Sequence, residues 1–183
     1  MNKSYLSIVL TISVVGLLVV GIGCQNQADK AELDKFRAAA STQERNKVIA
    51  RELFAAIDSA KFDRLEVLLS DDFVLNAPGM PQSWKKADLF QAIKMHYASF
   101  PDWTHVIENV VAEGDNVAVK LNQHGTQKAQ YEGIPATGKK VTNPAMHLMT
   151  IANGKVKDWW ALEDNLGFMQ QLGMDLKPAK IKK

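Results

Sequence analysis

Residues 103–127 read WTHVIENVVAEGDNVAVKLNQHGTQ, and this stretch decides the fold. Apolar and polar residues alternate with a period of two on both sides of the segment Glu113-Gly114-Asp115-Asn116, as in Val117, Val119 and Leu121. Period-two alternation is typical of a half-buried strand, and a segment of this composition is typical of a hairpin turn. The stretch therefore predicts two antiparallel strands, at about 103–112 and 117–127.

Two more strands follow at about 140–151 and 155–162, joined by the turn signal Asn153-Gly154. A last helix is predicted over 165–172, ending at the C-cap Gly173. In the fourth strand, plain alternation puts four residues on one side of the sheet. They are Val156, Trp160, Leu162 and Asp164. An acid is thus expected at the end of an otherwise apolar row.

The segment before residue 100 has mainly helical periodicity. Apolar residues recur every three to five positions and predict helices over about 43–57, 62–69 and 86–99, with a short strand over 71–76. Helices followed by an antiparallel meander indicate an α+β fold. We expect the curved sheet to wrap over the helices and to leave a cone with an enclosed pocket.

Several motifs resemble one protein family. They are Phe100-Pro101-Asp102-Trp103, Gly133-Ile134-Pro135-Ala136-Thr137-Gly138, the pair Trp160 and Asp164, and Gln170-Gln171-Leu172-Gly173. In this order they resemble the SnoaL-like polyketide cyclases, also called ester cyclases, over about 130 residues. The resemblance implies a cone-shaped fold like that of nuclear transport factor 2, with N-terminal helices packed against a curved, mostly antiparallel sheet.

The resemblance also implies an activity. In characterised cyclases of this family, an aspartate at the end of the last strand is the general acid/base of an intramolecular aldol ring closure that uses no metal or nucleotide. The matching residue here is Asp164. Where the family often has Gly-Thr-His, this chain reads Gly125-Thr126-Gln127. Glutamine forms hydrogen bonds but carries no proton at neutral pH, so the departure weakens the transfer of activity.

The candidate site residues follow from strand faces. Asp164 and His147 are the predicted catalytic residues, and the predicted substrate-binding residues are Asn76, Tyr97, Gln127 and Trp160. Two alternatives stay open. Asp164 is also well placed to be the N-cap of the last helix. His147, on one strand face with Ala145 and Met149, is equally compatible with a core histidine that has a hydrogen-bond partner.

The N-terminus has the layout of an export signal. Lys3 precedes an almost wholly apolar run over residues 5–22, and Gly21-Ile22-Gly23-Cys24 contains the only cysteine of the chain. This resembles the bacterial lipobox, in which the cysteine carries lipid. It predicts a lipoprotein signal peptide over 1–23, a polar and partly helical tether over 24–42, a SnoaL-like domain over 43–174 and a basic tail over 175–183. An uncleaved anchor and simple secretion are the alternatives.

The expected location is the cell envelope, with the domain attached to the lipid bilayer through Cys24 and facing the periplasm or the exterior. Gln25, which stands where an aspartate would favour retention in the inner membrane, weakly favours the outer membrane.

Composition argues against several other functions. The formal net charge is +2, which gives no field suited to nucleic acid. His-x-His, paired cysteines and His-Glu-x-x-His are absent, and no glycine-rich loop precedes a helix, so neither a metal nor another cofactor is expected.

Two functions remain. One is an acid/base enzyme of the cyclase or isomerase type acting on a small carbonyl or polyketide-like compound. The other is a non-catalytic lipoprotein of the cell envelope that binds a small hydrophobic molecule. A homodimer formed through the sheet is a further expectation.

Overall fold

The structure is a computed structural model that describes residues 3–175, with side chains for residue 27 and residues 29–175. It forms two compact units, Met1–Ser41 and Thr42–Lys183. A single helix, α1 (Lys3–Asp58), belongs to both units. The predicted tether over 24–42 is therefore helical, and its described side chains are mostly exposed.

The predicted lipidation residue, Cys24, and the predicted signal peptide lie outside the described side chains. Among the helices whose side chains are described, none combines the length and the apolar character needed to cross a membrane.

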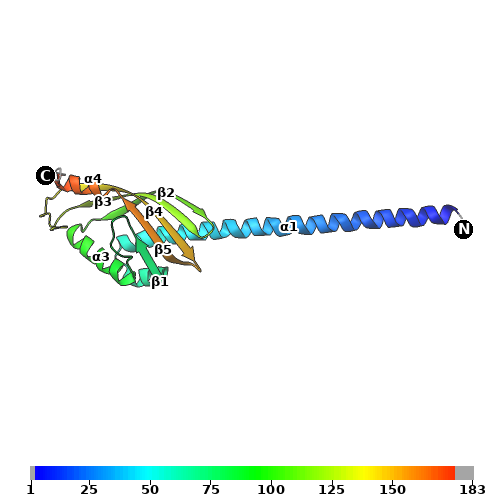
Figure 1. Cartoon of the computed structure of the whole chain (residues 1–183), viewed down its shortest axis with the longest axis horizontal. Coiled ribbons are helices and arrows are strands. Elements are labelled where there is room, and N and C mark those ends of the chain that lie inside the picture. Colours follow the sequence, from blue (N-terminus) through cyan, green and yellow to red (C-terminus); the bar gives the residue numbers. More distant parts are fainter. Residues whose placement is uncertain (1–2, 176–183) are drawn as a thin grey trace, which may run out of the picture. The chain divides into compact units, whose positions relative to one another are not determined.

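The second unit contains one five-stranded sheet in the order β1-β5-β4-β3-β2. Its strands are β1 (Leu69–Asn76), β2 (Thr104–Glu113), β3 (Asn116–Thr126), β4 (Lys140–Ala152) and β5 (Lys155–Glu163). The four strands β2 to β5 form the predicted antiparallel meander, and β1 pairs with β5 in the parallel direction. Figure 1 shows the sheet curving over the C-terminal turns of α1. The predicted α+β class is confirmed.

Three shorter helices complete this unit. They are α2 (Phe62–Leu68), α3 (Lys86–Ser99) and α4 (Asn165–Leu172). The main core joins the inner face of the sheet to α1, α2 and α3 around the fully buried rings of Phe54 and Phe73. Gly173 ends α4 in the left-handed region at φ 108°, as the sequence predicts.

A second apolar cluster attaches α4 to the sheet. It consists of Phe100, Trp103, Val141, Phe168 and Leu172. The Trp103 ring lies where a side chain at residue 125 would begin, so only glycine fits at that position. This close approach explains why the segment Gly125-Thr126-Gln127 at the end of β3 begins with glycine.

A β-bulge in β5 decides which side chains face inward. Thr150 pairs with Asp158 but the next residue, Ile151, pairs with Val156, so Lys157 is an extra residue in β5. From that point the alternation is shifted by one, and Trp159, Ala161 and Glu163 face inward instead of Trp160, Leu162 and Asp164. The predicted row of Val156, Trp160, Leu162 and Asp164 is therefore wrong beyond Val156.

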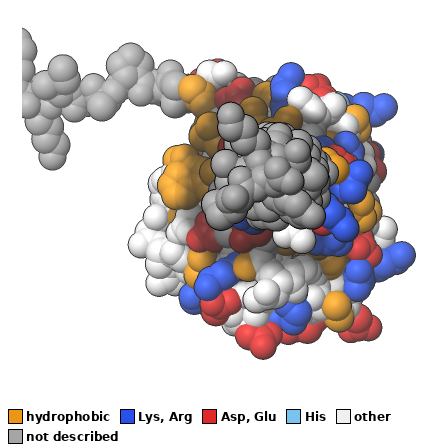
Figure 2. Space-filling model, turned by 90° about the vertical axis from the view of Figure 1, so that its right-hand side faces the viewer, with side chains coloured by type: hydrophobic (Ala, Val, Ile, Leu, Met, Phe, Trp, Pro, Cys, Tyr) orange, Lys and Arg blue, Asp and Glu red, His pale blue; other side chains and the backbone are white. Residues whose placement is uncertain are grey.

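The surface carries mixed charge. On the described part of the face shown in Figure 2, basic and acidic side chains alternate and leave no large area of one sign.

Candidate functional site

A pocket of about 800 Å³ lies between the inner face of the sheet, α3 and the segment that joins β1 to α3. A cavity of this volume is of the size that encloses a drug-sized molecule. Its apolar wall includes Ile57, Leu89, Ile93, Trp103, Trp159 and Phe168. Its polar lining includes His96, Tyr97, His105, Gln123, Tyr131, Asn143, His147 and Glu163.

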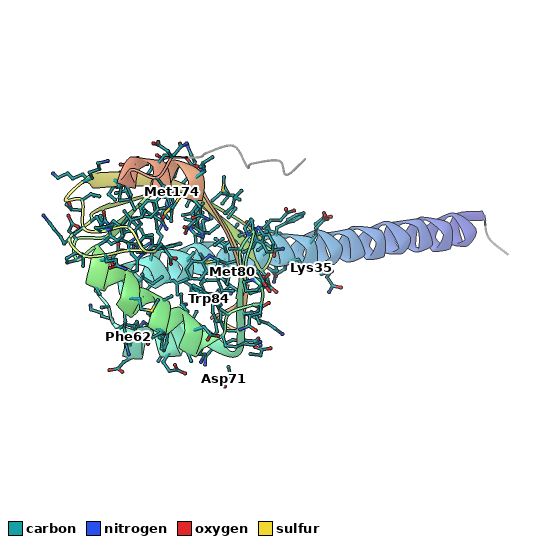
Figure 3. All side chains as sticks on the ribbon, turned by 60° about the vertical axis from the view of Figure 1, so that its left-hand side comes forward. Lys35, Phe62, Asp71, Met80, Trp84 and Met174 are labelled. Carbon is teal, nitrogen blue, oxygen red and sulfur yellow. The ribbon has the colours of Figure 1, made fainter. Side chains whose placement is uncertain are left out.

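The β1–α3 segment forms one border of the pocket. Met80 and Trp84, labelled in Figure 3, both line the cavity from this segment. The backbone groups of Leu75 and Trp84 exchange two hydrogen bonds of 2.9 Å, which fix both ends of the intervening loop. The border is thus tied to β1 by its backbone and lines the pocket with apolar side chains.

An acid–histidine pair reaches the pocket through its histidine, because His105 lines the cavity. Asp58, at the end of α1, has its Oδ1 2.5 Å from Nδ1 of His105 on β2, and its Oδ2 accepts a 3.1 Å hydrogen bond from the backbone N–H of His105. Only 7% of the His105 side chain is exposed. Since an ionised carboxylate can only accept, a neutral His105 keeps its proton on Nδ1 and its lone pair on Nε2.

A hydrogen-bond network continues from this pair across the sheet. Gln123 Nε2 lies 3.5 Å from His105 Nε2 and donates to Glu163 Oε1 at 3.0 Å. Asn143 Nδ2 donates to Gln123 Oε1 at 2.9 Å and to Glu163 Oε2 at 3.5 Å. Inward-facing residues of β2, β3, β4 and β5 thus connect two carboxylates through one histidine and two amides.

His147, in the middle of β4, is 1% exposed and accepts a 2.9 Å hydrogen bond at Nδ1 from the indole Nε1–H of Trp159. Burial, together with the proximity of His105, lowers the pKa of His147 to about 3. A histidine with this pKa is neutral at physiological pH, so His147 brings no positive charge into the pocket.

Three more titratable side chains line the cavity. His96 stacks on Phe100, with 4.9 Å between ring centroids, and burial lowers its pKa to about 4. Burial raises the pKa of Tyr97 well above its usual value, and the nearby Asp58 carboxylate adds to the effect. Burial also raises the pKa of Tyr131 to about 12. All three stay neutral at physiological pH, so a role in moving a proton falls to the other titratable groups of the lining, which include His105, Glu132 and Glu163.

Two of the predicted site residues, His147 and Tyr97, line the pocket, and their roles stay predictions. Asp164 does not line it and is exposed. Its Oδ1 accepts a 2.9 Å hydrogen bond from the backbone N–H of Gly167, which makes it the N-cap of α4. The capping alternative is therefore what the structure shows.

The other three predicted residues also lie outside the cavity lining. Trp160 is 46% exposed on the outer face of the sheet. Asn76 accepts a 2.5 Å hydrogen bond from Ser83 Oγ. Gln127 is fully buried and donates to the backbone oxygen of Ile134, while its Oε1 accepts from Thr137. Gln127 thus holds the β3–β4 connection in place.

Sequence reasoning missed Asp58, His105, Gln123, Asn143 and Glu163. Plain alternation was enough for three of them, because His105 shares a face with Ile107, Gln123 with Leu121, and Asn143 with His147. Glu163 was hidden by the bulge at Lys157. Among the side chains that the structure describes, no three His, Cys, Asp or Glu are grouped as a metal site.

This geometry defines a class of protein: a small cone-shaped α+β domain whose pocket contains acid/base groups. The sequence pattern of the SnoaL-like polyketide cyclases matches residues 47–172. The chain belongs to this family.

Curated relatives include aklanonic acid methyl ester cyclases of Streptomyces peucetius and of Streptomyces sp. strain C5. Each is 34% identical over 76 residues, which are 41% of this chain and 52% and 47% of the respective relatives. The matched part of the chain therefore spans about half the length of these relatives.

Solved structures share the fold over nearly their whole length. IdmH of Streptomyces antibioticus, assigned as a polyketide cyclase, has a TM-score of 0.66 and 23% identity, covering 70% of this chain and 99% of IdmH. A SnoaL-like polyketide cyclase of Agrobacterium tumefaciens has a TM-score of 0.57 and 20% identity, covering 68% and 95% of the two chains. At these identities the likeness shows the cone fold alone.

Proposed function

We propose that this protein is a cofactor-independent acid/base enzyme of the cyclase or isomerase type, acting on a small carbonyl or polyketide-like compound. One observation carries the proposal: His105, paired with Asp58, lines a pocket large enough for such a compound. The corrected base is therefore His105, oriented by Asp58, in place of Asp164.

The proposed step balances without any other reactant. Nε2 of His105 removes a proton from the carbon next to a substrate carbonyl, and the electron pair of that C–H bond becomes an enolate. In a cyclisation, the enolate carbon bonds to a second carbonyl carbon of the same molecule, whose oxygen takes the proton back from His105. In an isomerisation, the proton returns to another carbon. Positive charge on His105 is stabilised by the Asp58 carboxylate 2.5 Å away.

The family and its named relatives support this reaction type. Both curated relatives are named as cyclases of an ester substrate, and ring closure next to a carbonyl begins with the loss of an acidic C–H proton. Because this chain matches only about half of each relative, we use the relatives' substrate as a first probe and do not assign it to this protein.

The test measures proton removal directly. Purified protein is incubated in D₂O with aklanonic acid methyl ester, and deuterium incorporation next to the carbonyl is followed by NMR together with ring closure. We expect His105→Gln to slow both by a factor of about 10²–10⁴, the usual contribution of a general base. Asp58→Asn is expected to slow them less, since the imidazole remains.

The control for this test is His124→Gln, which changes a histidine of β3 that does not line the pocket. It should leave both rates unchanged. Full activity in both His105→Gln and Asp58→Asn would refute the assignment.

A non-catalytic binding protein is the second candidate, favoured by the predicted lipobox at Gly21–Cys24 and by the mostly apolar pocket wall. Ligand-dependent rises in melting temperature without deuterium exchange in any carbonyl probe would favour this function.

Attachment at Cys24 to the lipid of the cell envelope is part of either proposal. Incorporation of labelled palmitate that disappears in Cys24→Ser tests it.

A further inference from the structure

The pocket between the sheet and α3 carries negative charge that its own lining does not balance. Two carboxylates line it, those of Glu132 in the β3–β4 connection and Glu163 on β5, and among the residues that the structure describes no lysine or arginine does so. Neither carboxylate forms an ion pair with a described residue. A cavity lined by charge of one sign raises the local concentration of the opposite ion, here a cation.

The histidines of the described lining do not supply the missing positive charge. Burial lowers the pKa of His96 to about 4 and that of His147 to about 3, so both rings are neutral at physiological pH. Any positive charge on His105 is balanced by Asp58, whose Oδ1 lies 2.5 Å from the ring Nδ1. The pocket therefore keeps a net negative charge.

The hydrogen-bond network at Glu163 also leaves an acceptor free. An ionised carboxylate only accepts, so Nε2 of Gln123 faces Glu163, and Oε1 of Gln123 is turned to Asn143. Asn143 meets that oxygen with its Nδ2, which makes its Oδ1 an acceptor. This Oδ1 is shielded from solvent and has no hydrogen-bond partner among the described residues, on a side chain that lines the pocket and is 2% exposed. A buried acceptor without a donor costs free energy, so the site favours a ligand that donates.

Aromatic rings lie beside the two carboxylates. Burial, together with the negative charges of Glu132 and Glu163, raises the pKa of Tyr131 to about 12, so both carboxylates lie near this ring. The Phe168 ring stands almost perpendicular to the rings of Tyr131 and Trp103, at 87° and 82°, with 5.7 and 5.8 Å between centroids. All three rings line the pocket. Rings set at steep angles to one another are typical of sites that bind an ammonium group, because the face of each ring is negative.

We propose that the part of the pocket formed by Tyr131, Asn143, Glu163 and Phe168, here called the acidic corner, binds a protonated amine carried by a hydrophobic ligand. The ammonium group donates to the Glu163 carboxylate and to Oδ1 of Asn143, and the aromatic rings contact its remaining side. The rest of the lining is largely apolar and holds the uncharged body of the ligand. This inference goes beyond the proposed function, because it assigns a charge to the ligand and holds whether or not a reaction follows.

Four probes with one ring system test the inference by binding alone. They are 2-naphthylmethylamine, its N,N,N-trimethylammonium derivative, 2-naphthylmethanol and 2-naphthoate. Binding to the purified full chain is measured at pH 7 by isothermal titration calorimetry. We expect the amine to bind about ten- to a hundredfold more tightly than the alcohol, the worth of a hydrogen bond to a charged group. The trimethylammonium compound keeps the charge but cannot donate, so it should bind between these two, and the anionic naphthoate should bind most weakly.

Three variants locate the charge that the amine recognises. Glu163→Gln keeps the shape of the side chain and should bring the affinity for the amine to within about threefold of that for the alcohol. Glu132→Gln changes an exposed and therefore screened carboxylate, so it should weaken amine binding by only about two- to threefold. Asp164→Asn is the matched control: it removes the same charge one position further along the chain, outside the pocket lining, and should keep the full amine preference.

The uncharged alcohol reports on the pocket itself, so its affinity should be the same in every variant. Alcohol that binds as tightly as the amine to the unchanged protein would overturn the inference, as would equal affinity for the amine and its trimethylammonium derivative. An amine preference that survives in Glu163→Gln combined with Glu132→Gln would also overturn it. Because binding is measured without turnover, an inactive protein that prefers the amine would refute the proposed function alone. An active protein without this preference would refute the present inference alone.

Discussion

The two faces of β4 and β5 differ in polarity, and in the opposite sense from most half-buried sheets: polar side chains face inward and apolar side chains face outward. The inner face carries Asn143, His147 and Glu163 among apolar neighbours, whereas the outer face exposes Met146, Leu148, Trp160 and Leu162, each 46–51% exposed. These four are direct cross-strand partners, Met146 with Leu162 and Leu148 with Trp160. Polar groups thus lie where water is excluded, and apolar groups lie where water is available.

This contrast separates two kinds of task. Buried polar side chains cost free energy unless they are paired, so a network of them in a pocket indicates binding or catalysis. Exposed apolar side chains in one continuous row indicate a surface that another molecule covers. We therefore assign the inner face to the ligand and propose the outer face as the contact of the expected homodimer.

Among the changes that compare the two faces of the sheet, the largest effect is expected at two neighbouring carboxylates. Glu163→Gln removes the negative charge that orients Gln123 and Asn143, and we expect at least a tenfold loss of the rate of deuterium exchange. Asp164→Asn is the matched control. Asparagine is as good an N-cap as aspartate, so activity and folding should both be kept. Equal losses in the two variants would contradict the assignment of the pocket face.

The next effect concerns the acid sensitivity of folding. Folding lowers the pKa of His147 from 6.5 to about 3 and that of His96 to about 4, so below pH 6.5 the unfolded chain binds protons that the folded chain does not. Stability is therefore full above pH 6.5 and is lost as the pH falls toward 4 and then 3. At pH 5, each ring should account for a loss on the order of 1–2 kcal/mol, measured by urea unfolding.

The variant that sharpens this prediction is the double change His147→Phe and Trp159→Phe, which should reduce the loss between pH 7 and pH 5. His124→Gln, on the other face, should leave it as it is. Carboxylates with lowered pKa values, such as Asp102, change the stability only below about pH 4, so they do not contribute to the loss between pH 7 and pH 5. A stability that does not change from pH 7 to pH 5 would disprove the burial of neutral histidines.

The smallest expected effect on the folded domain comes from the outer face. Leu148→Glu with Trp160→Lys places opposite charges on a cross-strand pair, so the free energy of unfolding of the monomer should change by only about 0.5 kcal/mol. If this face joins two copies, the variant should be monomeric by light scattering at concentrations where the unchanged protein is a dimer. An unaltered association state would remove the outer face as the contact.

Much of the fold was predictable because the signals were local. Alternation and turn residues located β2 to β5 within two residues or so, and helical spacing located α3 and α4. The parallel pairing of β1 with β5 was not predictable in this way, since it joins segments about 85 residues apart and leaves no local pattern. The tether was predicted to be only partly helical, because its polar composition resembles that of a linker, whereas α1 runs through all of it.

The site was less accessible to sequence reasoning. His147 and Tyr97 were located by strand and helix periodicity, but Asp164 and Trp160 were placed on the wrong side by one extra residue in β5. Gln127 does face inward, yet its amide is fully engaged by Ile134 and Thr137, and such long-range pairing is not visible in a pattern. The Asp58–His105 pair joins α1 to β2 across 47 positions.

The extra residue at Lys157 has a meaning for the comparison of relatives. In a chain of otherwise identical sequence that lacks this residue, every side chain after it would point to the opposite face of the sheet. Trp160, Leu162 and Asp164 would then face the pocket, and Trp159 and Glu163 would face the solvent. An aspartate of another protein can therefore align with Asp164 in sequence and still point to the other face of the sheet. The two side chains point the same way only if the other strand also carries a residue equivalent to Lys157. Counting residues between the Asn153-Gly154 turn and the acid is a quick guide to which carboxylate each relative offers its substrate.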